Sequence, residues 1–202
     1  MSHMSEDHTH VQDFFGTRAA GWDRRFPDDE PAFATAVAEF GLRPGDRVLD
    51  AGCGTGRALT PLRAAVGPAG TVLGADLTPQ MLAAARQAGR AGDGALLLTD
   101  VARLPLRDAT LDAVFAAGLI AHLPDPEANL RELARVVRPG GRLALFHPIG
   151  RAALAARHGR ELTPDDLRAE HNLGPLLSAS GWDMTSYADE DERFLALAVR
   201  RA

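Results

Sequence analysis

Three glycines spaced two apart, Gly52, Gly54 and Gly56, follow an apolar run that ends in Asp50. Glycine has no side chain to block a ligand and readily adopts positive φ, so this spacing suits a turn that a ligand approaches closely. The helix expected after the turn offers free N–H groups that attract carboxylate or phosphate. In a doubly wound α/β sheet, such a turn lies at the carboxyl end of the first strand, where ligands bind. A glycine-rich turn alone is a weak signal, and the rest of the chain must support it.

Acidic residues close the next two apolar runs, Asp76 after residues 71–75 and Asp100 after residues 95–99. An acid at the end of the strand after a glycine turn is the expected acceptor for ribose hydroxyls. A nicotinamide dinucleotide is the main rival ligand, but its fingerprint places a third glycine where this chain has Arg57. The spacing therefore fits a shorter cofactor that carries no pyrophosphate.

Strand-like and helical patterns alternate through the middle of the chain. The strands are expected at residues 48–50, 71–75, 95–99, 111–117 and 142–147, and the helices at residues 31–40, 57–66, 78–89 and 125–138. Residues 104–108 are expected to form a loop before the fourth strand. As a general pattern each strand is followed by a helix, which predicts parallel strands joined by right-handed crossovers.

The pattern changes after residue 147. Residues 151–158 are alanine-rich and predict a helix, and Thr163-Pro164-Asp165-Asp166 is typical of the start of another helix that reaches about Ser180. Residues 182–187 and 193–199 are strand-like and too close together for a helical crossover. The sequence therefore predicts an α/β protein with a doubly wound, seven-stranded, mostly parallel sheet and an antiparallel hairpin at its C-terminal edge.

The N-terminal residues 10–26 carry aromatic residues at helical spacing, before the acidic linker Asp28-Asp29-Glu30. They are either packing for a terminal helix or a lid over a ligand. We divide the chain into a helical lid segment, residues 1–30, and a single domain, residues 31–202. Met1-Ser2-His3-Met4 is typical of a cloning scar and is left out of the fold argument.

Composition limits the partners and the location. The 202 residues suit one domain, and 46% hydrophobic and 24% charged residues are typical of a globular protein. A net charge of −5 without a basic run argues against nucleic acid, and no segment resembles a signal peptide or a membrane span. The single cysteine, Cys53, excludes an intrachain disulfide and favours a reducing, cytoplasmic location. Cys53 itself is better explained as a small residue that fits the turn than as a nucleophile.

Five segments in order resemble the motifs of the class I S-adenosylmethionine-dependent methyltransferases, in particular the branch related to the quinone-biosynthesis methyltransferases. They are residues 50–56, 74–82, 100–101, 111–123 and 135–141, and the resemblance is close over residues 40–147. The family usually has an aromatic residue where this chain has Leu111. The resemblance implies a Rossmann-like methyltransferase fold, to which the C-terminal hairpin also conforms.

The same resemblance implies S-adenosylmethionine as the cofactor. Its methionine part would meet the backbone of the glycine turn, Asp76 would hold the ribose, and Leu77, Asp100 and Val101 would contact the adenine. The residues assigned to the cofactor in this way are Asp50, Ala51, Gly52, Cys53, Gly54, Gly56, Asp76, Leu77, Asp100, Val101 and Ala117.

A sulfonium methyl group is already electrophilic, so the protein need only align the acceptor and exclude water, an effect of about 7 kcal/mol in well-aligned systems. A base helps when the acceptor is a hydroxyl or an acidic carbon. His122 and His147 follow the fourth and fifth strands and are the candidates, unless they are structural. We expect a small-molecule acceptor. The alternative is a binding partner or sensor that keeps the cofactor site without catalysis.

Other polar residues have two interpretations each. Arg151, Arg157 and Arg160 either orient an oxyanion on the acceptor or form the solvated face of a helix. His8 and His10 have the spacing of metal ligands but no partners nearby in the sequence, so no metal is expected.

Overall fold

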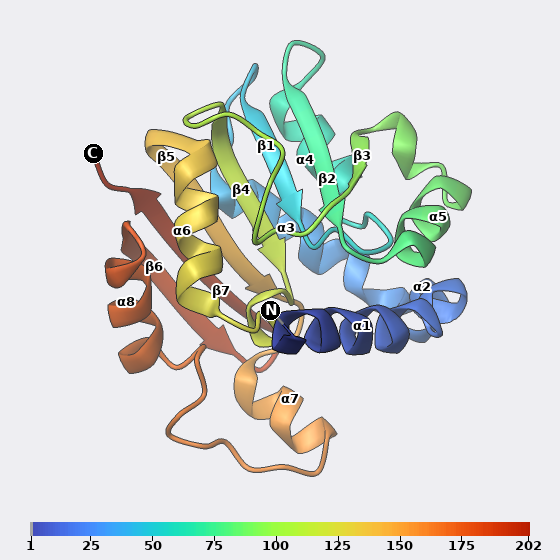
Figure 1. Ribbon diagram of the computed structural model, residues 1–202, viewed down its shortest axis with the longest axis vertical. Helices are drawn as coiled ribbons and strands as arrows, with labels where there is room; N and C mark the ends of the chain where they lie inside the picture. The colour runs from blue at the N-terminus through green and yellow to red at the C-terminus, as the bar shows by residue number, and fades with distance from the viewer. Residues whose placement is uncertain (1) are drawn as a thin grey trace.

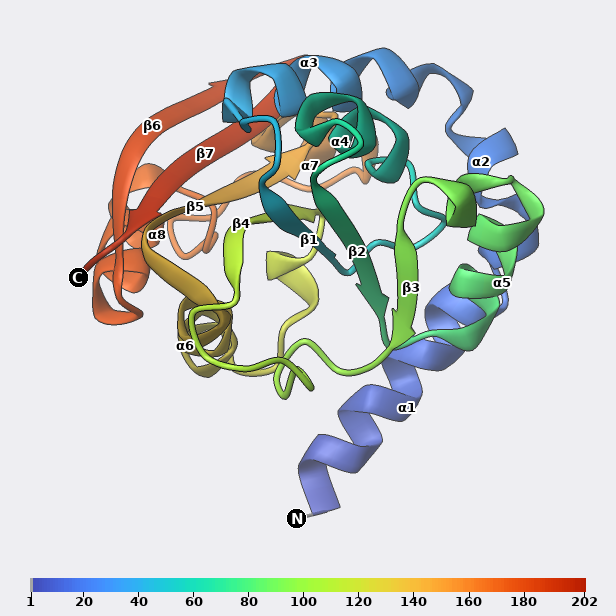
Figure 2. The ribbon, with the colours of Figure 1, turned by 90° about the horizontal axis from the view of Figure 1, so that it is seen from above.

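The computed structural model describes residues 2–202, apart from the side chains of residues 2–8 and of residue 28. Seven strands form one sheet in the order β3-β2-β1-β4-β5-β7-β6 (Figures 1 and 2). The parallel strands are β1 (Arg47–Ala51), β2 (Thr71–Asp76), β3 (Ala95–Leu98), β4 (Leu111–Ala117) and β5 (Val137–His147). β7 (Arg193–Arg200) runs antiparallel to β5 and to the edge strand β6 (Trp182–Glu190). The predicted α/β fold and its C-terminal hairpin are confirmed.

Helices cover both faces of the sheet (Figure 2). On one face lie α3 (Glu30–Phe40) and α4 (Leu59–Val66), and on the other lie α6 (Pro126–Val136) and α8 (Glu170–Ala179). Successive residues of a strand point to opposite faces, so Val48 packs with α3 and α4 whereas Leu49 packs in the core beneath α6 and α8. Trp182 is fully buried in that second core and donates its indole N–H to the Leu130 carbonyl at 3.0 Å.

The remaining helices gather around the carboxyl ends of the parallel strands. α5 (Pro79–Gln87) packs against β2 and β3. α1 (Ser2–Gly16) and α7 (Arg151–Arg157) lie below these strand ends in Figure 1, and α2 (Trp22–Arg25) continues from α1. Short 3-10 turns link these elements: η1 (Ala19–Gly21), η2 (Pro27–Asp29), η3 (Arg90–Gly92) and η4 (Ile120–His122).

The general prediction that a helix follows every strand is wrong between β3 and β4, whereas the loop predicted at residues 104–108 is confirmed. Residues 99–110 cross from the edge strand β3 to β4 as an irregular loop. Arg135 of α6 stabilises this loop, donating to the carbonyls of Leu104 at 3.2 Å and Leu106 at 2.9 Å and pairing with Asp108 at 2.6 Å. The side chain of a distant arginine therefore satisfies carbonyls that a crossover helix would have satisfied internally.

The helix predicted to begin near Thr163 begins at Glu170 instead. The Asp166 carboxylate accepts the backbone N–H of Arg168 at 2.9 Å, and the Asn172 amide donates to the carbonyls of Pro164 and Asp166 at 2.7 and 3.0 Å. These side-chain bonds compete with helix formation, so residues 163–169 form turns.

Several element boundaries also differ from the prediction. β5 starts at Val137 rather than at residue 142, α4 starts at Leu59 rather than at residue 57, and only residues 191–192 link the hairpin strands. The predicted acidic linker forms η2 and runs directly into α3. Among the helices of the described residues, none has the length and apolar character needed to cross a membrane.

Candidate functional site

A cavity of about 1020 Å³ opens at the carboxyl ends of the parallel strands. Its walls come from the loops after β1, β2, β3, β4 and β5 and from α1, α2 and α7. Of the residues predicted from the sequence, those that line it are Asp50, Gly52, Cys53, Gly54, Asp76, Leu77, Asp100, Val101, Ala117, His122 and His147.

Two residues assigned to the cofactor do not line the cavity. Ala51 is fully buried in the core beneath α6 and α8. Gly56 has a φ of +79°, and a Cβ built there would lie 2.8 Å from Cδ1 of Leu59. The third glycine of the motif therefore lets the turn pack against α4 and does not face a ligand.

The first glycines form a turn whose own N–H groups are used within the protein. Gly52 and Cys53 both donate to the Ala75 carbonyl, at 2.8 and 2.9 Å, and Gly54 donates to Oδ2 of Asp76 at 2.8 Å. Gly52 has a φ of +69°, and a Cβ there would lie 2.9 Å from Leu119. These residues thus offer a ligand close approach to the main chain, while their donors hold the turn onto β2.

Asp76 connects the glycine turn to the start of α5. Besides the Gly54 N–H, its carboxylate accepts the Thr78 N–H at 2.7 Å. Burial raises the pKa of Asp76, and the two backbone N–H groups act in the opposite direction. Each carboxylate oxygen has two lone pairs, so Asp76 keeps acceptor capacity toward the cavity that it lines.

Asp50 has no hydrogen-bond partner for either carboxylate oxygen within the described structure. The residue is 1% exposed and lines the cavity. Burial, reinforced by the charge of Asp76, raises the pKa of Asp50 to about 8. An unpaired buried carboxylate is costly when ionised, so this position favours a ligand that brings a positive charge or hydrogen-bond donors.

Cys53 is a free, buried cysteine beside these acids. Burial raises the pKa of its thiol well above the ordinary value, and the charges of Asp50 and Asp76 add to the effect. The thiolate is the reactive form of cysteine, so this environment makes Cys53 inert and agrees with its interpretation as a residue that fits the turn.

Asp23, in α2, was not predicted from the sequence and ties the N-terminal segment to the glycine turn. Its carboxylate accepts from Thr55 Oγ1 at 2.7 Å, Arg57 Nε at 3.1 Å and Arg90 Nη1 at 2.6 Å. Gln12 of α1 donates to the carbonyl of Leu77 at 2.9 Å. These partners lie far from Asp23 and Gln12 in the sequence, so no local pattern indicates the contacts.

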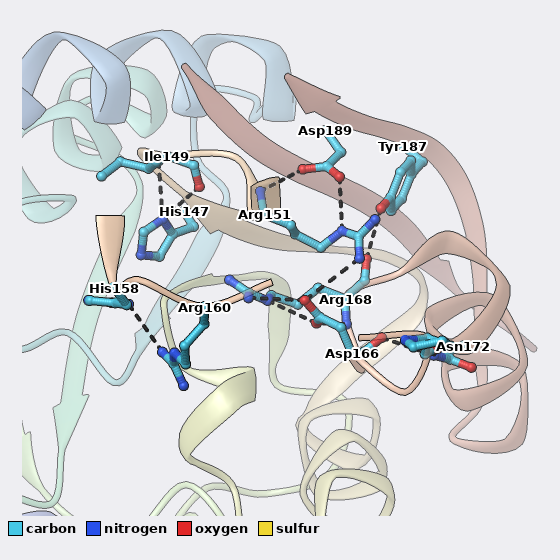
Figure 3. Close-up of polar contacts among 11 residues, drawn as sticks. His147, Ile149, Arg151, His158, Arg160, Asp166, Arg168, Asn172, Tyr187 and Asp189 are labelled. Atoms are coloured by element: carbon cyan, nitrogen blue, oxygen red, sulfur yellow. Dashed lines mark hydrogen bonds and ion pairs between the residues drawn. The ribbon is translucent and has the colours of Figure 1, made fainter. Parts of the chain in front are cut away.

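Both predicted histidines lie at the cavity, after β4 and at the end of β5. Nδ1 of His147 is 2.8 Å from the carbonyl oxygen and 3.1 Å from the nitrogen of Ile149 (Figure 3), and within the described structure Nε2 has no partner. Burial lowers the pKa of His147 to about 4, and the charge of Arg168 adds to this.

The His122 ring meets Phe15 of α1 edge to face at 5.0 Å between ring centroids. His122 lines the cavity and keeps part of its surface exposed, but partial burial among the surrounding protein atoms lowers the pKa of its ring, and the charge of Arg168 adds to this. The two depressed pKa values mean that His122 and His147 are both neutral at pH 7, the state in which a histidine accepts a proton.

The three arginines after β5 have different roles. Arg157 and Arg160 line the cavity, but Arg151 does not. Nε of Arg151 pairs with Asp189 at 2.9 Å, and Nη1 lies 3.6 Å from Asp166 (Figure 3). The hypothesis that Arg151 orients a ligand is therefore wrong, because its guanidinium holds α7 onto β6. Arg168, which the sequence analysis did not single out, lines the cavity instead.

No group of three or more metal-ligating side chains occurs among the described residues. The side chain of His8 lies outside them, and His10 is exposed at the cavity.

Comparisons with known proteins assign the family. The family model for a methyltransferase domain matches residues 49–145. Methyltransferase GfsG of Streptomyces halstedii is 33% identical over 74% of this chain and 57% of its own length. A ubiquinone/menaquinone biosynthesis C-methyltransferase of Ectopseudomonas mendocina (strain ymp) is 38% identical over 52% of this chain and 43% of its own.

The chain thus spans about half the length of these curated relatives. Among solved structures, an S-adenosylmethionine-dependent methyltransferase from Aquifex aeolicus is 28% identical, with a TM-score of 0.68 over 86% of this chain and 89% of that one. The ordered motifs, the strand order and these similarities agree, and the chain belongs to the class I S-adenosylmethionine-dependent methyltransferases.

Proposed function

We propose that this protein binds S-adenosylmethionine in the part of the cavity formed by the ends of β1, β2 and β3, and transfers its methyl group to a small molecule bound beside His122 and His147. The unpaired, buried carboxylate of Asp50 is the observation that carries the proposal. The cofactor has an ammonium and a sulfonium group, either of which would offset this acid.

The residues at the strand ends fit the parts of the cofactor. Asp50 would face the amino acid part, where the lack of side chains at Gly52 and Gly54 allows close approach. Asp76 would accept from the ribose hydroxyls with its remaining lone pairs. Leu77 and Val101 would pack against the adenine, with Asp100 at its edge and Ala117 at the far wall.

The bound cofactor supplies an electrophilic methyl group. The remaining contribution of the protein is to hold the acceptor in line, keep water out and remove a proton where the acceptor has one. His147 suits proton removal because its ring is fixed by Ile149, is neutral at pH 7 and has an unpartnered Nε2 within the described structure. His122, which is also neutral, is the second such group.

The N-terminal residues 1–30 would act as a lid that keeps water from this reaction. Phe15 packs on His122, Gln12 bonds to Leu77, and Asp23 binds Thr55 and Arg57 of the glycine turn. The segment thus contacts both the cofactor part and the acceptor part of the cavity. A lid needs such contacts on both sides of the site that it covers.

Isothermal titration of S-adenosylhomocysteine, the demethylated cofactor, tests the cofactor site. The wild-type protein should bind, and Asp76→Asn should weaken binding at least about tenfold because a charged acceptor is lost. Asp183→Asn is the matched control, because Asp183 is exposed on β6. Absence of binding to the wild-type protein would overturn the proposal. Binding without turnover of any acceptor would favour the sensor alternative.

A further inference from the structure

The carboxylates of the cavity wall are unevenly distributed along the chain, whereas arginines line it from both halves, Arg18, Arg25 and Arg57 in the first. Every described carboxylate in the wall comes from the first half of the chain, at Asp29, Asp50, Asp76 and Asp100. The described wall residues beyond residue 101 include no carboxylate but do include Arg157, Arg160 and Arg168. Asp50, Asp76 and Asp100 lie at or just after the ends of β1, β2 and β3, whereas these three arginines follow β5, which lies on the other side of β1.

Arg157 and Arg160 have no carboxylate partner among the described residues, in contrast to Arg151 and Arg168 nearby. The Arg157 guanidinium carbon lies 5.6 Å from the centroid of the Phe26 ring, which holds it at the cavity. Nη2 of Arg160 lies 3.1 Å from Nδ1 of the neighbouring His158 (Figure 3). Two exposed guanidinium groups thus line one cavity, and no carboxylate of the described residues pairs with either.

Arg168 adds a third guanidinium whose position is fixed. Its Nε and Nη2 donate to the Asp166 carboxylate at 3.3 and 3.2 Å, and Tyr187 donates its hydroxyl to the Arg168 carbonyl at 2.9 Å. Figure 3 shows the Arg168 guanidinium on the side of Asp166 that faces Arg160 and His147. Arg168 lines the same cavity as His122 and His147, and its charge lowers the pKa of both histidines.

The wall beside these arginines is apolar. Phe26, Ile149 and Leu154 line it, and α1 and α2 contribute Phe15 and Trp22. A guanidinium forms paired hydrogen bonds to carboxylate and phosphate oxygens. An acceptor that fits this part of the cavity therefore has an apolar body and an oxyanion at one end.

We infer that the methyl acceptor is a small amphipathic anion whose carboxylate or phosphate group is bound by Arg157 and Arg160, with Arg168 beside them and the apolar body toward Phe26 and Leu154. The inference rests on the proposed function and adds the substrate class. With the anion bound at the α7 end, the group to be methylated lies between it and the cofactor, alongside His147.

Binding of simple probes to the protein saturated with S-adenosylhomocysteine tests the inference. Benzoate and phenyl phosphate carry the two oxyanions on one apolar ring, and benzyl alcohol is the neutral control. Both anions, or one of them, should bind more tightly than the alcohol, and the stronger of the two identifies the oxyanion. Their affinity should fall as salt is added, since the contact is between charges.

The double variant Arg157→Gln, Arg160→Gln should lower the affinity for the anion by about tenfold or more, because two charge-assisted contacts are lost. Arg157→Lys, Arg160→Lys should restore part of the affinity, because it restores the charge without the paired geometry. Arg131→Gln, in an exposed ion pair on α6, is the matched control and should leave anion binding unchanged.

Three results would overturn the inference: equal binding of the alcohol and the anions, no binding of either anion, or an unchanged anion affinity in the double glutamine variant. Each is distinct from failure of the proposed function, which appears in the earlier titration as absence of S-adenosylhomocysteine binding. Retained binding of S-adenosylhomocysteine by the double variant would show that it is folded.

Discussion

The two ends of the cavity are built in opposite ways. At the end formed by β1, β2 and β3, the polar groups belong to short turns, and Asp76 binds the main chain of Gly54 and Thr78 directly. At the end formed by β5 and α7, the polar groups are long side chains, and Arg168 is placed by Asp166 of the same loop and by Tyr187 of β6. The first end is defined by backbone geometry and the second by side-chain pairing.

This difference suggests how one family can act on many acceptors. Backbone geometry tolerates little substitution, whereas a side-chain cluster on a helix and a surface loop can change without disturbing the sheet. Changes in the first end should therefore abolish cofactor binding, while changes in the second should alter the acceptor and leave the fold intact. Substitutions at the two ends test that contrast.

Gly52→Ala should have the largest effect. The residue has a φ of +69°, and the added Cβ would lie 2.9 Å from Leu119. A non-glycine residue in that conformation costs about 1–3 kcal/mol, and the displaced turn should bind S-adenosylhomocysteine at least about tenfold more weakly. Calorimetric titration and urea unfolding measure the two effects.

Gly92→Ala is the matched control for this substitution. Gly92 has an ordinary φ, and nothing lies within 4 Å of a Cβ built there. It should retain the wild-type affinity. If Gly52→Ala behaved like this control, the first end of the cavity would not depend on backbone geometry.

Asp50→Asn should remove a pH dependence of stability. The pKa of Asp50 is raised to about 8 in the folded protein from 3.8, so the unfolded state releases this proton first as pH rises. This group therefore lowers stability by about 1.4 kcal/mol per pH unit between those two values. From pH 5 to pH 7, the free energy of unfolding of the wild-type protein should fall by about 1.4 kcal/mol per pH unit more than that of the variant.

Cofactor binding should also change the protonation state of Asp50. A cation beside Asp50 favours its ionised form, so S-adenosylhomocysteine should bind more tightly to the wild-type protein as pH rises toward 8. Asp50→Asn should bind weakly, without that rise. Equal pH slopes for both proteins, in urea unfolding and in titration, would mean that Asp50 is already paired in solution.

Asp23→Ala should have a smaller effect on stability, about 1–2 kcal/mol in urea unfolding. Arg57, whose side chain is buried, would lose one of its acids but keep Asp29, and Arg90 would keep Glu30. Asp13→Ala, at an exposed position of α1, is the control. An unchanged free energy of unfolding for Asp23→Ala would show that the proposed lid is not attached to the glycine turn.

The difference between the two ends of the cavity also explains which site residues could be predicted from the sequence. Gly52, Gly54 and Asp76 follow consecutive strands, and the carboxyl ends of parallel strands meet at one edge, so spacing alone brings them together. Arg168 reaches the cavity only because residues 163–169 form turns where a helix was predicted, and because Asp166 binds its guanidinium.

Two further differences between prediction and structure also come from side-chain contacts between distant parts of the chain. Arg151 and Arg157 bracket α7 and look alike in sequence, yet Asp189 of β6 draws the first away from the cavity while Phe26 of α2 draws the second toward it. The loop between β3 and β4 depends on Arg135 of α6. Local patterns predict strands, helices and turns, but such long-range pairings depend on the finished fold.

Arg168→Gln should have the smallest effect, a change confined to the pKa values of the two histidines near the β5 and α7 end of the cavity. Burial is the main cause of the depressed pKa values of His122 and His147, and the positive charge of Arg168 is a secondary cause for both. Removing that charge should raise both pKa values, while burial keeps them below the ordinary 6.5.

Titration of the histidine ring protons by NMR measures the shift, with Arg131→Gln as the control. A pKa of His147 that stays at about 4 in the Arg168 variant would show that the charge of Arg168 does not act on this histidine. A rise would show that the guanidinium of Arg168 helps to keep the neighbouring bases neutral.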